Sequence, residues 1–138
     1  MREEDVIAQT NGGHPTIIQG GMGVAVSGWE LANAVAAKGQ MGVVSGTALD
    51  LVCSRRLQLG DPGGHVRRAL EHFPVPEAAQ RVLDTYYVPG GKEPTKPFKN
   101  VRSMTITPSR ELLELLVIGN FVEVYLAKEN VPGPVGIN

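Results

Sequence analysis

The sequence predicts a mixed α/β fold built on parallel β-strands. An apolar run that begins at Ile17 breaks into glycines at 20–23, an amphipathic helix follows, and a second apolar run ends at Gly46. Strand, helix and strand in this order form a β-α-β unit with parallel strands. Glycines at a strand end leave room for a flat or anionic ligand to approach the backbone. Because such units place ligands at the carboxyl ends of their strands, the sequence indicates a cofactor site there.

The helix of this unit is expected over Gly28–Lys38. Ser27 and Glu30 have the spacing of a capping box, in which each side chain bonds the other residue's backbone amide. Gly39 then supplies a left-handed stop. The near-continuous apolar character of the first strand predicts that it is covered on both faces. The flanking strands are expected at residues 16–19 and 41–45.

Composition restricts the classes of function. The chain has 138 residues, 42% hydrophobic and 20% charged, with a formal net charge of −1. The sequence has no long run of basic residues of the kind that binds nucleic acid. It also has no apolar stretch that approaches the roughly 18 residues of a membrane span. His14, His65 and His72 lack the spacing of a metal site. With Cys53 as the only cysteine and no signal-peptide pattern, we expect a cytoplasmic protein without a disulfide or a membrane partner.

The C-terminal part predicts one long helix and a third strand. Thr107 is expected as the N-cap and Pro108 as the first helical residue, with the helix continuing to about Glu129. The pair Gly119-Asn120 within it indicates a kink or a close packing contact. The third strand is expected over Val135–Asn138. Parallel strands feeding helices in series suggest the N-terminal portion, about three βα units, of a TIM (β/α)₈ barrel, which typically has about 250 residues. We therefore expect residues 1–138 to be a partial barrel domain.

A long helical insertion, residues 47–107, separates the second and third strands. Helices are expected within it at 66–73 and 76–87, followed by an exposed loop at 88–97. Connections from strand to helix lie on the catalytic face of a barrel, so the insertion is expected on that face. Four cations line the loop region, which suggests either a solvated loop or an anion-attracting rim for an acyl-carrier or coenzyme A substrate: Lys92, Lys96, Lys99 and Arg102.

A dinucleotide-binding Rossmann unit is the first alternative for the glycine motif. That fingerprint opens its helix within the glycines and places an acidic residue after the second strand. Here residues 24–26 separate the glycines from the helix, and Ser45-Gly46-Thr47 follows the second strand. Both features oppose nucleotide binding in that mode.

A flavin fits the motif better. The backbone of Gly20, Gly21 and Met22 could address the polar edge of the ring, and the thioether of Met22 is soft and polarizable. The amide of Asn138, at the end of the third strand, offers a donor and an acceptor.

Three segments resemble the nitronate monooxygenase family, formerly called 2-nitropropane dioxygenases, which also contains FMN-dependent enoyl reductases of fatty acid synthesis. Pro15–Met22 is similar to its opening strand, Lys38–Gly46 to its second element, and Pro134–Asn138 to its third strand. The resemblance implies a TIM barrel that binds FMN non-covalently. It implies flavin contacts at Met22 and Asn138, and further contacts at Gly20, Gly21 and Gly46. The family's later phosphate-binding loops and catalytic histidine region have no counterpart here, so this chain alone is expected to bind FMN poorly.

The resemblance implies an FMN-dependent oxidoreductase that oxidises alkyl nitronates with flavin and dioxygen, and we expect this chain to be a truncated form of it. No catalytic acid or base can be assigned. Alternatives are an FMN- and NAD(P)H-dependent enoyl reductase acting on enoyl thioesters, a phosphate-binding isomerase or synthase on a βα-barrel, and a non-catalytic βα fragment. The fragment would act by forming a homo-oligomer, or would pair with the missing C-terminal half of the barrel.

Overall fold

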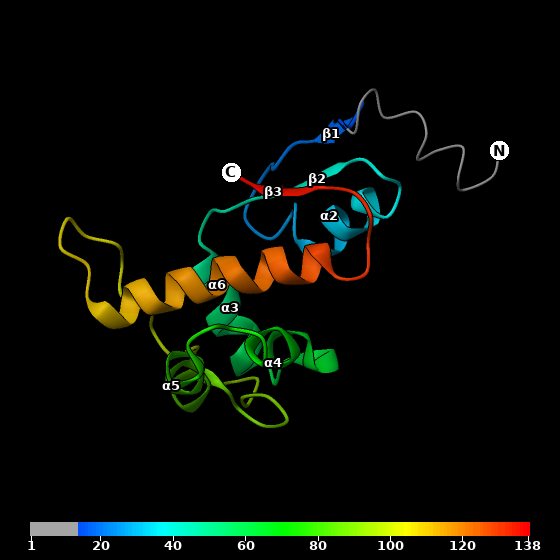
Figure 1. Cartoon of the computed structure of the whole chain (residues 1–138). Coiled ribbons are helices and arrows are strands. Elements are labelled where there is room, and N and C mark those ends of the chain that lie inside the picture. The colour runs from blue at the N-terminus through cyan, green and yellow to red at the C-terminus, as the bar shows by residue number, and fades with distance from the viewer. Residues whose placement is uncertain (1–13) are drawn as a thin grey trace. The chain divides into compact units, whose positions relative to one another are not determined.

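The computed structural model describes residues 14–138, which form a mixed α/β structure of two compact units (Figure 1). The sheet unit runs through Thr47 and includes Glu123–Asn138, and the helical unit is Ala48–Val122. Within the described residues the elements are β1 (Ile18–Gln19), α2 (Trp29–Ala36), β2 (Met41–Val44), α3 (Leu49–Gln58), the 3₁₀ turn η2 (Pro62–Gly64), α4 (His65–Leu70), α5 (Pro76–Tyr86), α6 (Arg110–Lys128) and β3 (Val135–Ile137). None of the helices in this part of the chain is long and apolar enough to cross a membrane.

The three strands form one parallel sheet in the order β1-β2-β3 (Figure 1). Ile18 pairs with Met41, and Gly42 and Val44 pair with Val135 and Ile137. The predicted parallel β-α-β unit is therefore confirmed, with strands slightly shorter than expected.

Two glutamine side chains fasten β1 to β2. Oε1 of Gln40 accepts hydrogen bonds from the backbone amides of Thr16 (3.1 Å) and Ile17 (2.8 Å). The amide of Gln19 bonds both backbone groups of Val43, donating to its carbonyl (3.1 Å) and accepting from its N–H (3.2 Å). Each side-chain amide thus takes the place of a peptide group of a neighbouring strand.

The first strand is not covered on both faces, so that prediction was wrong. The side chains of Ile17 and Ile18 are 61% and 62% exposed. A continuous apolar run indicates burial only where other elements cover both faces.

Helix α2 packs against β2 at very short range. Ala32 and Ala36 are fully buried, and a Cβ atom on Gly42 would clash with the backbone of Ala32. The left-handed conformation predicted for Gly39 is confirmed by its φ of +72°, but α2 ends at Ala36, two residues before the predicted end. These small residues let the helix and strand backbones approach each other closely.

The predicted capping box at α2 was wrong. Gly28 is the N-cap, and no side chain caps the helix locally. The hydroxyl of Ser27 instead accepts a hydrogen bond from the amide of Met22 (3.0 Å), and the amide of Trp29 donates to the carboxylate of Glu123 (2.9 Å). Tertiary partners therefore replace the local ones.

The helical unit contains one helix that was not predicted, α3. Its buried residues include Leu49, Cys53 and Leu57, and also the polar Ser54 and Gln58. Helix α5 agrees with its prediction within one residue, whereas α4 is shorter than the predicted 66–73. Phe73 and Phe121 of this unit stack edge to face with ring centroids 5.1 Å apart.

Helix α6 begins later than predicted. Thr107 and Pro108 lie outside it, and the hydroxyl of Ser109 accepts from the amide of Leu112 (3.2 Å), as an N-cap does. The helix continues unbroken through Gly119, where a Cβ atom would clash with the carbonyl of Leu49. The glycine therefore marks a close packing contact and not a kink.

Candidate functional site at the carboxyl ends of the strands

Three of the five predicted flavin-binding residues lie together at the carboxyl ends of the strands. The side-chain amide of Asn138 donates to the carbonyl of Gly21 (3.3 Å), and the amide of Gly46 donates to the carbonyl of Asn138 (2.9 Å). The amide of Asn138 in turn donates to the carbonyl of Val44 (3.2 Å). Because all three strands are parallel, the ends of β1, β2 and β3 meet at one edge.

Two of the glycines make room for Asn138. A Cβ atom on Gly21 would clash with the side-chain amide of Asn138, and one on Gly46 would clash with its backbone carbonyl. By contrast, a Cβ atom on Gly20 would meet nothing within 4 Å. Gly20 is therefore the position where open space lies beside the backbone, while Gly21 and Gly46 fix the asparagine.

Met22 is held through its backbone and leaves its side chain in solvent. Its side chain is 64% exposed, and its amide donates to the buried hydroxyl of Ser27. The carbonyl of Ser27 accepts from the amide of Ser45 (2.9 Å). The loop after β1 is thus bonded to the end of β2, which holds the backbone of Met22 in place.

These five residues can orient a bound ligand but supply no group for acid–base chemistry. They contribute one exposed amide side chain, one thioether and glycine backbone, but no acid, base or cation. Among residues 14–138, no group of three or more His, Cys, Asp or Glu side chains could hold a metal ion. The edge can position a ligand by hydrogen bonds, whereas proton transfer would need other groups.

An apolar rim around this edge was missed by the sequence reasoning. Val24 and Val26 follow Met22 on the same loop, and their side chains are 47% and 66% exposed. Ile137, the last residue of β3, is 40% exposed. The apolar run 24–26 was the available signal, because it precedes the helix and lies outside a strand.

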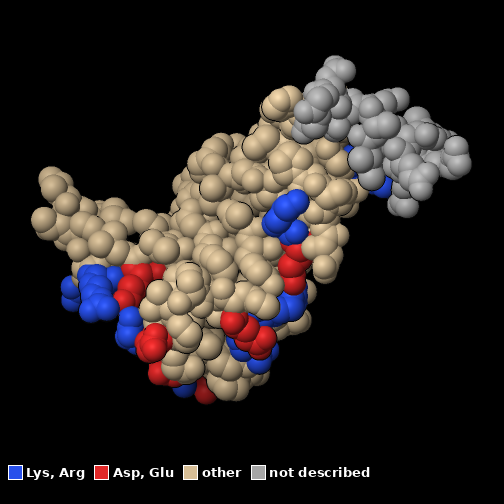
Figure 2. All heavy atoms as spheres, in the orientation of Figure 1, with Lys and Arg blue, Asp and Glu red and all other residues tan. Residues whose placement is uncertain are grey.

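The loop cations of the helical unit mostly bond to their own surroundings. The ammonium of Lys92 donates to the carbonyls of Glu93 (3.2 Å) and Lys96 (2.5 Å), Lys96 pairs with Glu93 (3.2 Å), and Lys99 donates to the carbonyl of Thr85 (3.2 Å). Figure 2 shows positive and negative side chains interspersed on the visible face. These contacts favour an internally bonded loop over a rim that attracts anions.

Comparison with known proteins finds no matching family model, no matching curated protein and no matching solved structure.

Proposed function

We propose that this chain supplies the N-terminal strands of an FMN-dependent βα-barrel oxidoreductase of the nitronate monooxygenase type. One observation carries the proposal, the convergence of Gly21, Gly46 and Asn138 at the carboxyl ends of three parallel strands. That edge is where parallel α/β folds bind ligands.

The strand order supports a barrel as the parent fold. The strands lie in the sheet in the order of the sequence, each parallel to the one before, as successive strands of a barrel do. In this proposal β1 and β3 are the edges that further strands would pair.

The residues fit the ring of a flavin better than its phosphate. In the proposed complex the amide of Asn138 and the backbone at Gly20 and Gly21 address the polar edge of the ring, and Met22 contacts its face. Gly46 acts indirectly, because its amide fixes Asn138. Bound FMN would supply electron transfer between substrate and dioxygen or NAD(P)H. The five residues carry no cation, so the phosphate would be held by residues outside this set.

Nuclear magnetic resonance tests this proposal, because it also detects weak binding. FMN is added to ¹⁵N-labelled protein at about 1 mM, enough to populate a complex with a millimolar Kd. We expect shifts of the amides at residues 20–22, 46 and 138, and their loss in Asn138→Ala. Asn100→Ala, an exposed asparagine of the helical unit, serves as the matched control.

Inorganic phosphate separates ring binding from anion binding. If phosphate alone reproduces the shifts, or FMN perturbs none of the five amides, the flavin site is excluded. Shifts confined to these amides would justify assays with nitronates and, for the enoyl reductase alternative, with enoyl thioesters.

Self-association is the second candidate function, favoured by the exposed Ile17 and Ile18 beside the edge strand β1. An edge strand with exposed apolar side chains is a template for pairing with another chain. Sedimentation of the wild type and Ile18→Thr tests it, since a self-associating chain changes mass with concentration and the variant weakens that change.

A further inference from the structure

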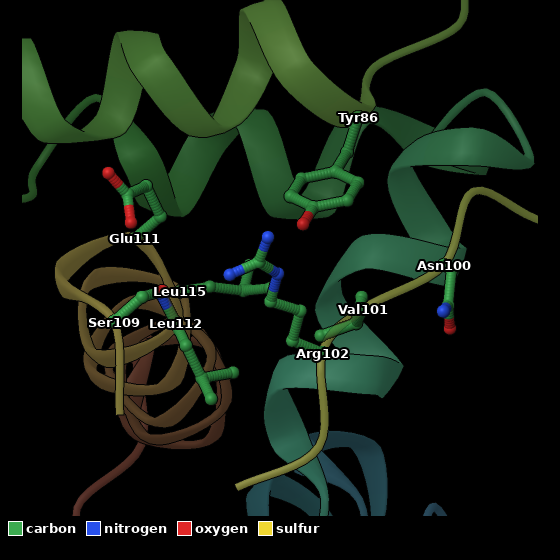
Figure 3. Close-up of a pocket in the computed structure, with 8 residues that line it drawn as sticks. All are labelled: Tyr86, Asn100, Val101, Arg102, Ser109, Glu111, Leu112 and Leu115. Carbon is green, nitrogen blue, oxygen red and sulfur yellow. The ribbon is translucent and has the colours of Figure 1, made fainter. Parts of the chain in front are cut away.

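A cavity of about 410 Å³ in the helical unit has polar walls and an apolar floor (Figure 3). It lies among the end of α5, the chain before α6 and the first turn of α6. The lining residues are Tyr86, Asn100, Val101, Arg102, Ser109, Glu111, Leu112 and Leu115.

Arg102 differs from the other cations of its loop region. Whereas Lys92 and Lys99 donate to backbone carbonyls and Lys96 donates to the carboxylate of Glu93, the guanidinium of Arg102 makes no hydrogen bond or ion pair with any residue of 14–138. Figure 3 shows it directed into the cavity, between Glu111 and the hydroxyl of Tyr86. Its five N–H donors are therefore available to a ligand.

Glu111 and Tyr86 complete the polar wall. Hydrogen bonds from its own backbone amide and from the hydroxyl of Ser109, together with the charge of Arg102, hold the pKa of Glu111 below its usual range. Burial, assisted by the negative charge of Asp50, raises the pKa of Tyr86. Near neutral pH one cavity therefore contains a cation, an anion and a neutral phenol.

The apolar residues that line the cavity indicate that the ligand has a small aliphatic part. Leu112 and Leu115 are 5% and 1% exposed, and with Val101 they line the side of the cavity formed by α6 and the preceding loop. An aliphatic group of a few carbon atoms would bury apolar area there.

We propose that this cavity binds a small zwitterion of the α-amino acid class with an aliphatic side chain. Arg102 receives the carboxylate, with Tyr86 donating its hydroxyl, and Glu111 receives the ammonium group. A lone anion is disfavoured because Glu111 repels it, and a lone cation because Arg102 does. A ligand with both charges can pair with Arg102 and with Glu111 at the same time, so the site selects zwitterions.

Titration calorimetry with three probes tests the proposal on the full chain. The probes are leucine, N-acetylleucine, which keeps only the carboxylate, and leucinamide, which keeps only the ammonium. We expect leucine to bind and the other two to bind about tenfold more weakly or worse, because each lacks one charge-assisted contact.

Matched variants locate the site. Arg102→Gln and Glu111→Gln should each weaken leucine binding by about tenfold or more, whereas Arg110→Gln should change it by less than about twofold. Arg110 is the control because it lies next to Glu111 in the sequence but pairs with Glu114, away from this cavity. Thermal unfolding shows whether each variant is folded.

Three outcomes would overturn the proposal. Equal affinity for leucine and N-acetylleucine would reduce the site to a carboxylate site, and equal binding by all the variants would place the ligand elsewhere. Absence of leucine binding to the folded wild type would exclude the ligand class. The inference is independent of the flavin proposal, whose amides belong to the sheet unit.

Discussion

The backbone amide of Trp29, the first residue of α2, donates to the carboxylate of Glu123 at 2.9 Å across 94 residues of sequence. The side chain of Glu123 is only 2% exposed. The start of α2 therefore receives its acceptor from α6 and not from its own flanking residues, and the negative charge faces the positive end of the helix dipole.

Replacing Glu123 should destabilise the protein. Glu123→Ala leaves a backbone donor without its acceptor and is expected to lower the free energy of unfolding by about 2–3 kcal/mol. Glu123→Gln retains an oxygen acceptor and should cost about half as much. Urea unfolding measures both, and equal losses for the two variants would show that the acceptor is not what matters.

Gly42 should tolerate no side chain. Gly42→Ala forces a Cβ atom against the backbone of Ala32, which cannot move without displacing α2, so a loss of about 3 kcal/mol or more is expected. Gly20→Ala is the matched control: with nothing within 4 Å of its Cβ, it should change stability by less than about 0.5 kcal/mol. Similar melting temperatures for the two variants would contradict the close approach of α2 and β2.

Asp61 should be replaceable by Asn far more easily than by Ala. Its buried carboxylate accepts from the amides of Val66 and Arg67, both at 3.0 Å, and its φ is +48°. Asp61→Ala loses these bonds and strains the backbone, for an expected cost of about 2–4 kcal/mol. Asp61→Asn keeps one acceptor and tolerates this conformation, so about 1 kcal/mol is expected. Equal costs in chemical unfolding would exclude the capping role.

Glu114 should contribute to stability in a manner that depends on pH. Hydrogen bonds and charge from Arg81, and then from Arg110, hold its pKa below its usual value of 4.5. A depressed pKa in the folded protein means that the contribution is present above pH 4.5 and is lost as the pH falls through the folded value.

The melting temperature of Glu114→Gln should therefore lie below that of the wild type at pH 7, and the difference should shrink toward pH 3. Glu93→Gln removes an ion pair whose partners are both about two-thirds exposed, and it serves as the control. A difference for Glu114→Gln that is constant with pH would contradict the argument.

The sequence was sufficient to predict the β-α-β unit, because a short connection and the left-handed Gly39 leave few alternatives to a parallel pair. The same holds for the meeting of Gly21, Gly46 and Asn138, which all follow strands of one parallel sheet. The role of Gly21 and Gly46 as space for Asn138 depends on the fit of atoms from distant segments, which spacing does not reveal.

Helix α3 was missed for a local reason. Its buried face mixes Cys53 and Leu57 with Ser54 and Gln58, so the apolar periodicity is interrupted. The polar pair is hydrogen-bonded, since Ser54 donates to the carbonyl of Leu51 (3.0 Å), Gln58 donates to that of Ser54 (3.2 Å), and the side-chain oxygen of Gln58 accepts from the amide of Lys99 (2.6 Å). A pattern based on hydrophobicity alone does not show that such polar side chains are buried with their hydrogen bonds made.

The sheet unit is discontinuous, with the whole of Ala48–Val122 inserted between β2 and its partner β3. During synthesis on the ribosome, the helical unit is made before β3, so Gly42 of β2 cannot pair with Val135 until that unit has been synthesised. The helical unit is contiguous and can form from local contacts in the meantime, which shortens the loop that the pairing has to close. We therefore expect the helical unit to form before β3 joins the sheet.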